Sequence, residues 1–102
     1  MVEYTNYLSN EEISRYIIIY FKANFKKFRL ISSSDNGRYF EMNFSDENIG
    51  ILIKKEVGFW IEIVIDNTEY ELWRFDKSVN NYTECTKQNI LYQLSVLKSF
   101  LQ

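Results

Sequence analysis

Histidine is absent from the chain of 102 residues. Its absence excludes Ser-His-Asp and Cys-His catalysis and removes the commonest ligand of transition metals. The sequence also has no P-loop, no G-x-G-x-x-G motif and no calcium-loop motif, so neither nucleotide nor calcium binding has a recognisable signature. We therefore expect no catalytic residue, no metal site and no cofactor.

Cysteine occurs once, at Cys85, so an internal disulfide and a Cys-rich zinc site are excluded. A single thiol fits a reducing, cytoplasmic setting. The first residues lack the basic and apolar segments of a signal peptide. The longest apolar run, Ile17–Phe21, is much too short to span a bilayer. We expect a cytoplasmic protein that does not contact the membrane.

Proline is also absent and only three glycines occur, so no linker divides the chain. Hydrophobic residues make up 46% and aromatic residues 18% of the sequence, which is far from a disordered composition. A chain of this length can enclose one core. We expect a single domain over residues 1–102.

Two segments have the pattern of amphipathic helices. Ser9 and Glu12 form a capping-box pair, and apolar residues then recur at three- and four-residue steps to about Phe25. A second helix is expected over about residues 86–101, with Thr83 or Thr86 as its N-cap.

The region between these helices alternates between apolar and polar residues, as strands do. Turn signals separate the segments: Asn36-Gly37, where two positive-φ residues are expected, Gly58, where a left-handed residue is expected, and Asp66–Thr68. The expected strands are Phe28–Ser32, Arg38–Phe44, Ile49–Lys54, Phe59–Ile65 and Glu69–Phe75.

This order predicts an α+β fold in which an N-terminal helix, an antiparallel sheet of four to five strands and a C-terminal helix follow one another. Short connections make a meander the simplest topology. Each helix has an apolar stripe to bury. Both helices are therefore expected on the sheet face that carries Phe40, Ile51, Ile61 and Ile63.

The second sheet face combines aromatic and acidic residues, a pattern typical of interfaces with buried aromatic anchors. Its details depend on the last strand, since either Tyr70 and Leu72 or Trp73 and Phe75 face the core. Tyr39 and Tyr70 are expected to join this face. The candidate partner-binding residues are Glu41, Trp60, Glu62, Glu69, Glu71 and Trp73.

Two other functional interpretations, catalysis by carboxylates and nucleic-acid binding, are set against ordinary structural explanations of the same residues. Carboxylates such as Glu62, Glu69 and Glu71 could catalyse hydrolysis, but isolated carboxylates more often form a solvated strand face. The cations between Lys22 and Arg29 resemble a nucleic-acid patch, but they also suit a helix C-terminus. The net charge of −2 argues against general nucleic-acid binding.

The short chain, the expected helix–sheet–helix order and the acidic-aromatic strands Phe59–Asp66 and Glu69–Phe75 resemble those of small bacterial immunity proteins. These include the immunity proteins of contact-dependent inhibition systems. The resemblance is one of general type and has no specific motif. It implies a non-enzymatic inhibitor that covers or distorts the active site of a toxin, often a nuclease, whose surface is basic. We expect the chain to be a monomer or a homodimer.

A small ligand-binding or oligomerising domain is the alternative to this interpretation.

If the acidic face binds a partner, joint charge reversal at Glu62, Glu69 and Glu71 is expected to weaken binding and to leave the melting temperature unchanged.

Overall fold

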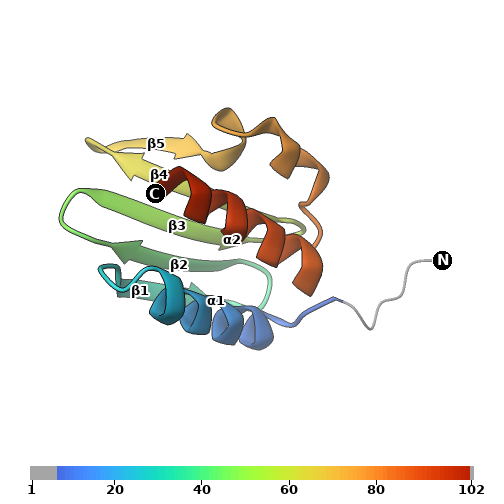
Figure 1. Cartoon of the computed structure of the whole chain (residues 1–102). Coiled ribbons are helices and arrows are strands. Elements are labelled where there is room, and N and C mark those ends of the chain that lie inside the picture. The colour runs from blue at the N-terminus through green and yellow to red at the C-terminus, as the bar shows by residue number, and fades with distance from the viewer. Residues whose placement is uncertain (1–6, 102) are drawn as a thin grey trace.

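A computed structural model describes residues 7–101 and confirms the α+β fold (Figure 1). All five strands are antiparallel, and their order in the sheet is β1-β2-β3-β4-β5, the predicted meander. The elements are α1 (Asn10–Asn24), β1 (Arg29–Asp35), β2 (Phe40–Ser45), β3 (Ile49–Lys55), β4 (Phe59–Ile65), β5 (Thr68–Glu71) and α2 (Lys87–Leu101), with 3-10 helices at Leu72–Arg74 and Lys77–Asn81 before α2.

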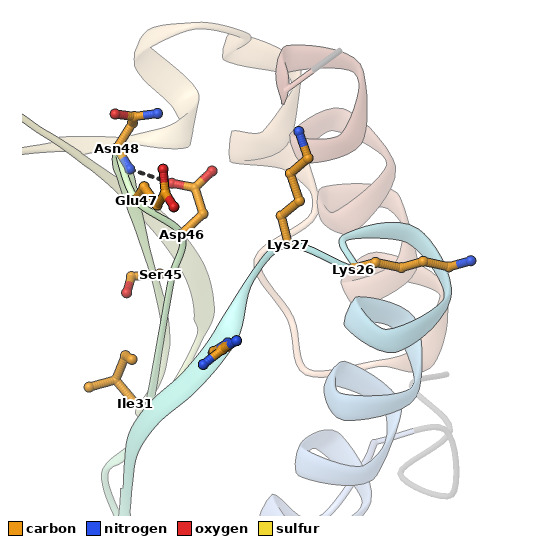
Figure 2. Close-up of a pocket in the computed structure, with 8 residues that line it drawn as sticks. Lys26, Lys27, Ile31, Ser45, Asp46, Glu47 and Asn48 are labelled. Atoms are coloured by element: carbon orange, nitrogen blue, oxygen red, sulfur yellow. Dashed lines mark hydrogen bonds between the residues drawn. The ribbon is translucent and has the colours of Figure 1, made fainter.

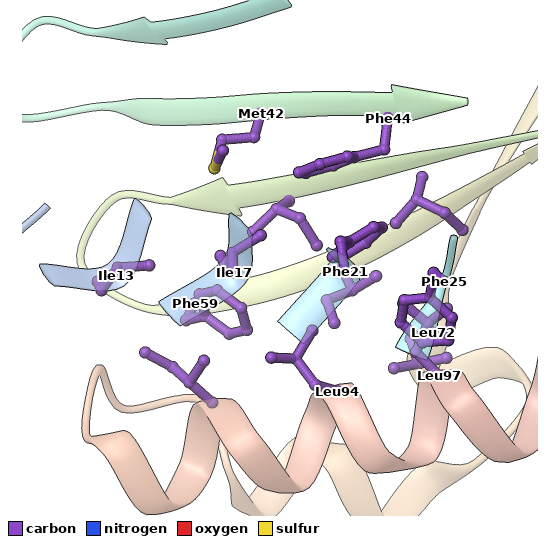
Figure 3. Close-up of a cluster of buried hydrophobic side chains, with 14 of the residues drawn as sticks. Ile13, Ile17, Phe21, Phe25, Met42, Phe44, Phe59, Leu72, Leu94 and Leu97 are labelled. Atoms are coloured by element: carbon purple, nitrogen blue, oxygen red, sulfur yellow. The ribbon is translucent and has the colours of Figure 1, made fainter. Parts of the chain in front are cut away.

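Both helices lie on the same face of the sheet (Figure 1), as the apolar stripes predicted. In Figure 3, Met42 and Phe44 of β2 point toward the helices, because alternate residues of a strand point to one face. Phe21 of α1 stacks on Phe44, with ring centroids 3.9 Å apart. The other core residues include Ile13, Ile17, Phe40, Ile51, Ile53, Phe59, Ile61, Ile63, Leu72, Ile90, Leu94 and Leu97.

The helices begin where their capping residues predicted. The Glu12 N–H donates to Ser9 Oγ at 3.2 Å, and Glu12 Oε1 accepts from the Ser9 N–H at 3.1 Å, which completes the capping box. At α2 the Asn89 N–H donates to Thr86 Oγ1 at 3.2 Å, so Thr86 rather than Thr83 is the cap. No helix within residues 7–101 has the length and apolar character needed to cross a membrane.

The positive-φ turn lies at the last hairpin rather than at Asn36-Gly37. Asp66 and Asn67 have φ of 51° and 64°, as a tight turn between β4 and β5 requires. At Asn36-Gly37 only Gly37 has a positive φ, of 91°, so the expectation of two such residues there is wrong. Asn36 Oδ1 instead accepts from the Tyr39 N–H at 2.7 Å. Side-chain bonding of this kind closes a turn without a second left-handed residue.

Gly58 is needed for space and not for its backbone angle. Among the described glycines only Gly37 has a positive φ, so the expected left-handed role of Gly58 is wrong. A Cβ at Gly58 would lie 3.1 Å from the carbonyl oxygen of Thr83. The same carbonyl accepts from the Phe59 N–H at 2.7 Å. Glycine therefore allows the segment before α2 to approach the start of β4 closely.

The last strand is shorter than expected, and its register is settled by its pairing with β4. Tyr70 lies opposite Ile63, so Tyr70 and then Leu72 face the helices. The expectation that the strand continues to Phe75 is wrong, because the chain turns into the 3-10 helix Leu72–Arg74. Leu72 is buried in the core there. The turn places Leu72 under α2 and starts the return path to that helix.

Gln93 holds this return path in place. It is 1% exposed on α2, and its Nε2 donates to the Phe59 carbonyl at 3.0 Å and to the Tyr82 carbonyl at 2.8 Å. A buried amide is tolerated when its donors are satisfied. The side chain therefore joins the helix, the central strand and the segment that precedes the helix.

Candidate partner-binding surface

The sheet face opposite the helices, called the open face below, is covered by neither helix (Figure 1). Cross-strand pairing places Glu41, Lys54 and Trp60 in one row of this face. Glu62 and Glu71 are directly opposite each other in the next row. The residues of the open face on β2 to β5 are Glu41, Asn43, Leu52, Lys54, Trp60, Glu62, Val64, Glu69 and Glu71.

Glu62 is the centre of the open face and is only 8% exposed. Lys54 Nζ lies 3.0 Å from its Oε1, and Trp60 Nε1 donates to its Oε2 at 2.8 Å. Burial acts to lower the pKa of the Lys54 amine, but the hydrogen bond from Lys54 to Glu62 and the nearby carboxylates raise that pKa overall. The Lys54 amine therefore keeps its charge beside Glu62, and the hydrogen bond from Trp60 Nε1 to Glu62 fixes the indole against the sheet.

Tyr39 engages a second carboxylate, that of Glu41, at the start of β2. Its hydroxyl donates to Glu41 Oε1 at 2.7 Å. Burial, followed by the hydrogen bond to Glu41 and the charge of that residue, raises the pKa of Tyr39 to about 12. The phenol therefore remains protonated at neutral pH and keeps donating to Glu41. Tyr39 lies on this face as the alternation predicted.

Trp73 reaches the open face from the 3-10 helix that follows β5. Its Nε1 donates to Glu71 Oε2, while its ring packs partly against the core. The guanidinium carbon of Arg74 lies 5.3 Å from the centroid of the same ring. Trp73 therefore lies at the rim of the open face and is not an anchor at its centre.

Glu69, the candidate residue on β5, is exposed to solvent.

The structure brings most of the candidate residues together. The four glutamates and Trp60 share the open face, and Trp73 joins them through Glu71. Tyr70 does not: its predicted place beside the carboxylates is wrong, because it faces the helices. A further correction concerns Glu62, whose buried ion pair makes charge reversal there damaging to the fold. A test of the surface therefore has to use more exposed positions.

The open face carries a strong excess of negative charge. Four glutamates surround one lysine, and the charges of Glu62, Glu69 and Glu41 all act on the Lys54 amine. Such a surface attracts cationic groups and repels a second copy of itself. Aromatic N–H and O–H donors hold three of the carboxylates, so their positions are fixed before a partner arrives.

The geometry supports catalysis and metal binding less than it supports the binding of a cationic partner. Glu62 and Glu71 are neighbours across the strands, but each carboxylate already accepts hydrogen bonds from the protein, Glu62 from Lys54 and Trp60 and Glu71 from Trp73. Within residues 7–101, no group of three or more Cys, Asp or Glu side chains is close enough to hold a metal ion. Cys85 is buried, and its burial raises the pKa of the thiol, the opposite of what an activated nucleophile requires.

The basic segment after α1 borders a separate hollow of mixed charge. Figure 2 shows Lys26 and Lys27 on the connection after α1, and Asp46 and Glu47 on the turn between β2 and β3. Arg29 also lines this hollow. Because two carboxylates share the hollow with three cations, it lacks the uniformly positive surface that binds phosphate groups.

Comparison with known proteins gives no match for this chain. No family model matches it, and neither a curated protein nor a solved structure matches it at a significant level.

Proposed function

We propose that the chain is a non-enzymatic binding protein that neutralises a cognate protein toxin by binding it on the open face. The observation that carries the proposal is the uncovered acidic face itself, where Glu41, Glu62, Glu69 and Glu71 share one side of the sheet with Trp60. The partner is a basic domain, for which a nuclease is the leading class because nuclease surfaces are cationic where they bind phosphate. Binding takes place in the cytoplasm and needs no cofactor.

The proposed binding has two steps with different residues. Exposed carboxylates, Glu69 foremost, accelerate the encounter with a basic surface. Trp60 then provides a partly exposed aromatic surface for the partner. Its indole is already fixed by Glu62, so little side-chain freedom is lost on binding. Together these groups cover the basic site of the toxin.

A growth assay tests this function. The protein encoded beside this chain is expressed alone, with the chain, and with variants of it. We expect the wild-type chain to relieve growth arrest, and the double variant Trp60→Ala/Glu69→Lys to lose at least about tenfold in affinity and with it most protection. Glu47→Lys, on the exposed turn before β3, makes the same charge change away from the open face and should protect fully.

The outcome of this assay decides for or against the open face. Equal protection by the double variant and by the control would show that binding occurs elsewhere. Absence of any growth arrest by the neighbouring protein would contradict the toxin-neutralising role. The melting temperature of each variant, measured in parallel, separates lost binding from lost folding.

A further inference from the structure

Strand β1 forms an unprotected edge of the sheet. All seven of its residues are exposed, including Leu30 at 44% and Ile31 at 60%. An edge strand leaves a row of backbone N–H and C=O groups free to pair with another strand. The register shift between Leu30 and Ser32 limits regular pairing to the second half of β1.

The hydrogen-bond alternation identifies which groups of β1 point outward. The Asn36 N–H donates to the Tyr39 carbonyl, so this pair is hydrogen bonded. Antiparallel ladders alternate bonded and non-bonded pairs. Ser34 and Ser32 therefore direct their backbone groups toward β2, whereas Ser33 directs its N–H and C=O away from the sheet.

An apolar groove runs beside this edge, between α1 and β1. Ile18 from the helix, Phe28 from the connection and Leu30 from the strand contribute its apolar side chains. Lys22 and Lys26 lie along it as well. A strand added to β1 would bring its own neighbouring side chains over this groove and remove the apolar groups from water.

The two ends of the β1 edge carry charges of opposite sign. The start of α1 lies beside the end of β1, since Asn10 Nδ2 donates to Asp35 Oδ1 at 2.8 Å, and Glu11 and Glu12 follow there. At the opposite end the groove beside Leu30 carries Lys22 and Lys26. Arg15 pairs with Glu11 at 2.9 Å and offsets part of the negative charge at the start of α1. Glu12 and Asp35 leave an acidic excess at this end of the edge, and the other end is basic.

We propose that two copies of the chain pair through β1 in antiparallel orientation, about a two-fold axis at Ser33. The Ser33 N–H donates to the carbonyl of the partner's Ser33, and the symmetric bond forms in return. The antiparallel arrangement places the acidic end of one edge against the basic end of the other, with Glu11 facing the partner's Lys22. This charge polarity favours a second copy over an unrelated strand.

The pairing goes beyond the proposed toxin binding and is compatible with it. The two sheets become one ten-stranded sheet with both α1 helices on one side. The two open faces then lie on the other side, where each remains free for a partner. The dimer therefore presents two equivalent acidic surfaces.

Sedimentation velocity over a concentration series tests the proposal. We expect the wild type to change from monomer to dimer as concentration rises. Ser33→Pro removes the outward N–H while leaving the bonds to β2 in place, so it should remain monomeric at every concentration. Ser33→Ala retains the N–H and should dimerise like the wild type.

Charge exchange across the axis provides a second test that does not disturb the strand. Glu11→Lys and Lys22→Glu should each raise the dimer dissociation constant by about tenfold, because each affects two symmetric contacts. The double variant Glu11→Lys/Lys22→Glu restores opposite charges and should regain most of the affinity. A monomeric wild type, an unchanged dimer in Ser33→Pro, or a double variant no better than the single ones would overturn the pairing.

Discussion

Replacing Lys54 by methionine is expected to lower the free energy of unfolding by about 2–3 kcal/mol, because it leaves a largely buried carboxylate without its counter-ion. Lys54 and Glu62 side chains are only 17% and 10% exposed, and their charged atoms lie 3.0 Å apart. Trp60 Nε1 would remain as a donor to Glu62, but a neutral donor does not replace a cation. Chemical denaturation of Lys54→Met and wild type measures the difference.

The matched control removes both charges. In Lys54→Met/Glu62→Leu no charge is left buried, so stability should return to within about 1 kcal/mol of the wild type. A single variant as stable as the wild type would show that water already screens this pair. The double variant also loses part of the acidic surface, so the stabilising role of Glu62 and its proposed role in binding can be compared in one protein.

Ile17→Ala is expected to cost about 3–4 kcal/mol, in the range typical of a large side chain truncated in a core. Ile17 is fully buried on α1 and points into the cluster that Figure 3 shows. Ile19 on the same helix is 65% exposed. The substitution Ile19→Ala makes the same change in helix propensity and should alter stability by no more than about 0.5 kcal/mol.

Thermal and denaturant melts of the two variants provide this comparison. Because both positions lie in the middle of α1, a difference between them reports burial alone. Equal costs at the two positions would contradict the packing of α1 on the sheet.

The fold could be predicted from sequence because local signals and burial agree. The Ser9–Glu12 capping box fixed the start of α1, and the alternation in β2 placed Phe40, Met42 and Phe44 toward the helices. The short turns allowed only neighbouring strands to pair. Each of these features depends on residues close in the chain, which is why a pattern can reveal them.

The end of β5 and the location of Trp73 could not be predicted in the same way. Alternation continues from Glu69 to Phe75 in the sequence, but the strand ends at Glu71. Leu72 is buried where the chain turns into a 3-10 helix. That choice depends on the space left under α2, which lies far away in the sequence.

The candidate surface was predicted by residue type but not by its internal bonding. The strands placed Glu41, Glu62 and Glu71 on the open face, as expected. Their partners come from cross-strand and i,i+2 neighbours, whose side chains have several possible rotamers. The burial of Glu62 follows from these contacts, and its carboxylate holds the Trp60 indole instead of facing solvent as an exposed charge.

The proposed function therefore depends most on the parts of the open face that remain accessible. Glu69 is exposed, and Trp60 is partly exposed above a fixed carboxylate. Toxin binding at these residues and dimerisation through β1 use different surfaces, so failure of one leaves the other standing.

Nuclear magnetic resonance of the chain during titration with the proposed toxin partner, sought first in the adjacent gene, tests the central claim most directly. The indole N–H groups of Trp60 and Trp73 give two resolvable signals, from the centre and the rim of the open face. We expect the Trp60 signal to shift most on binding, together with the amides of β3 and β4. Binding that shifts only amides of α1 and α2, and leaves both indole signals unchanged, would contradict the account.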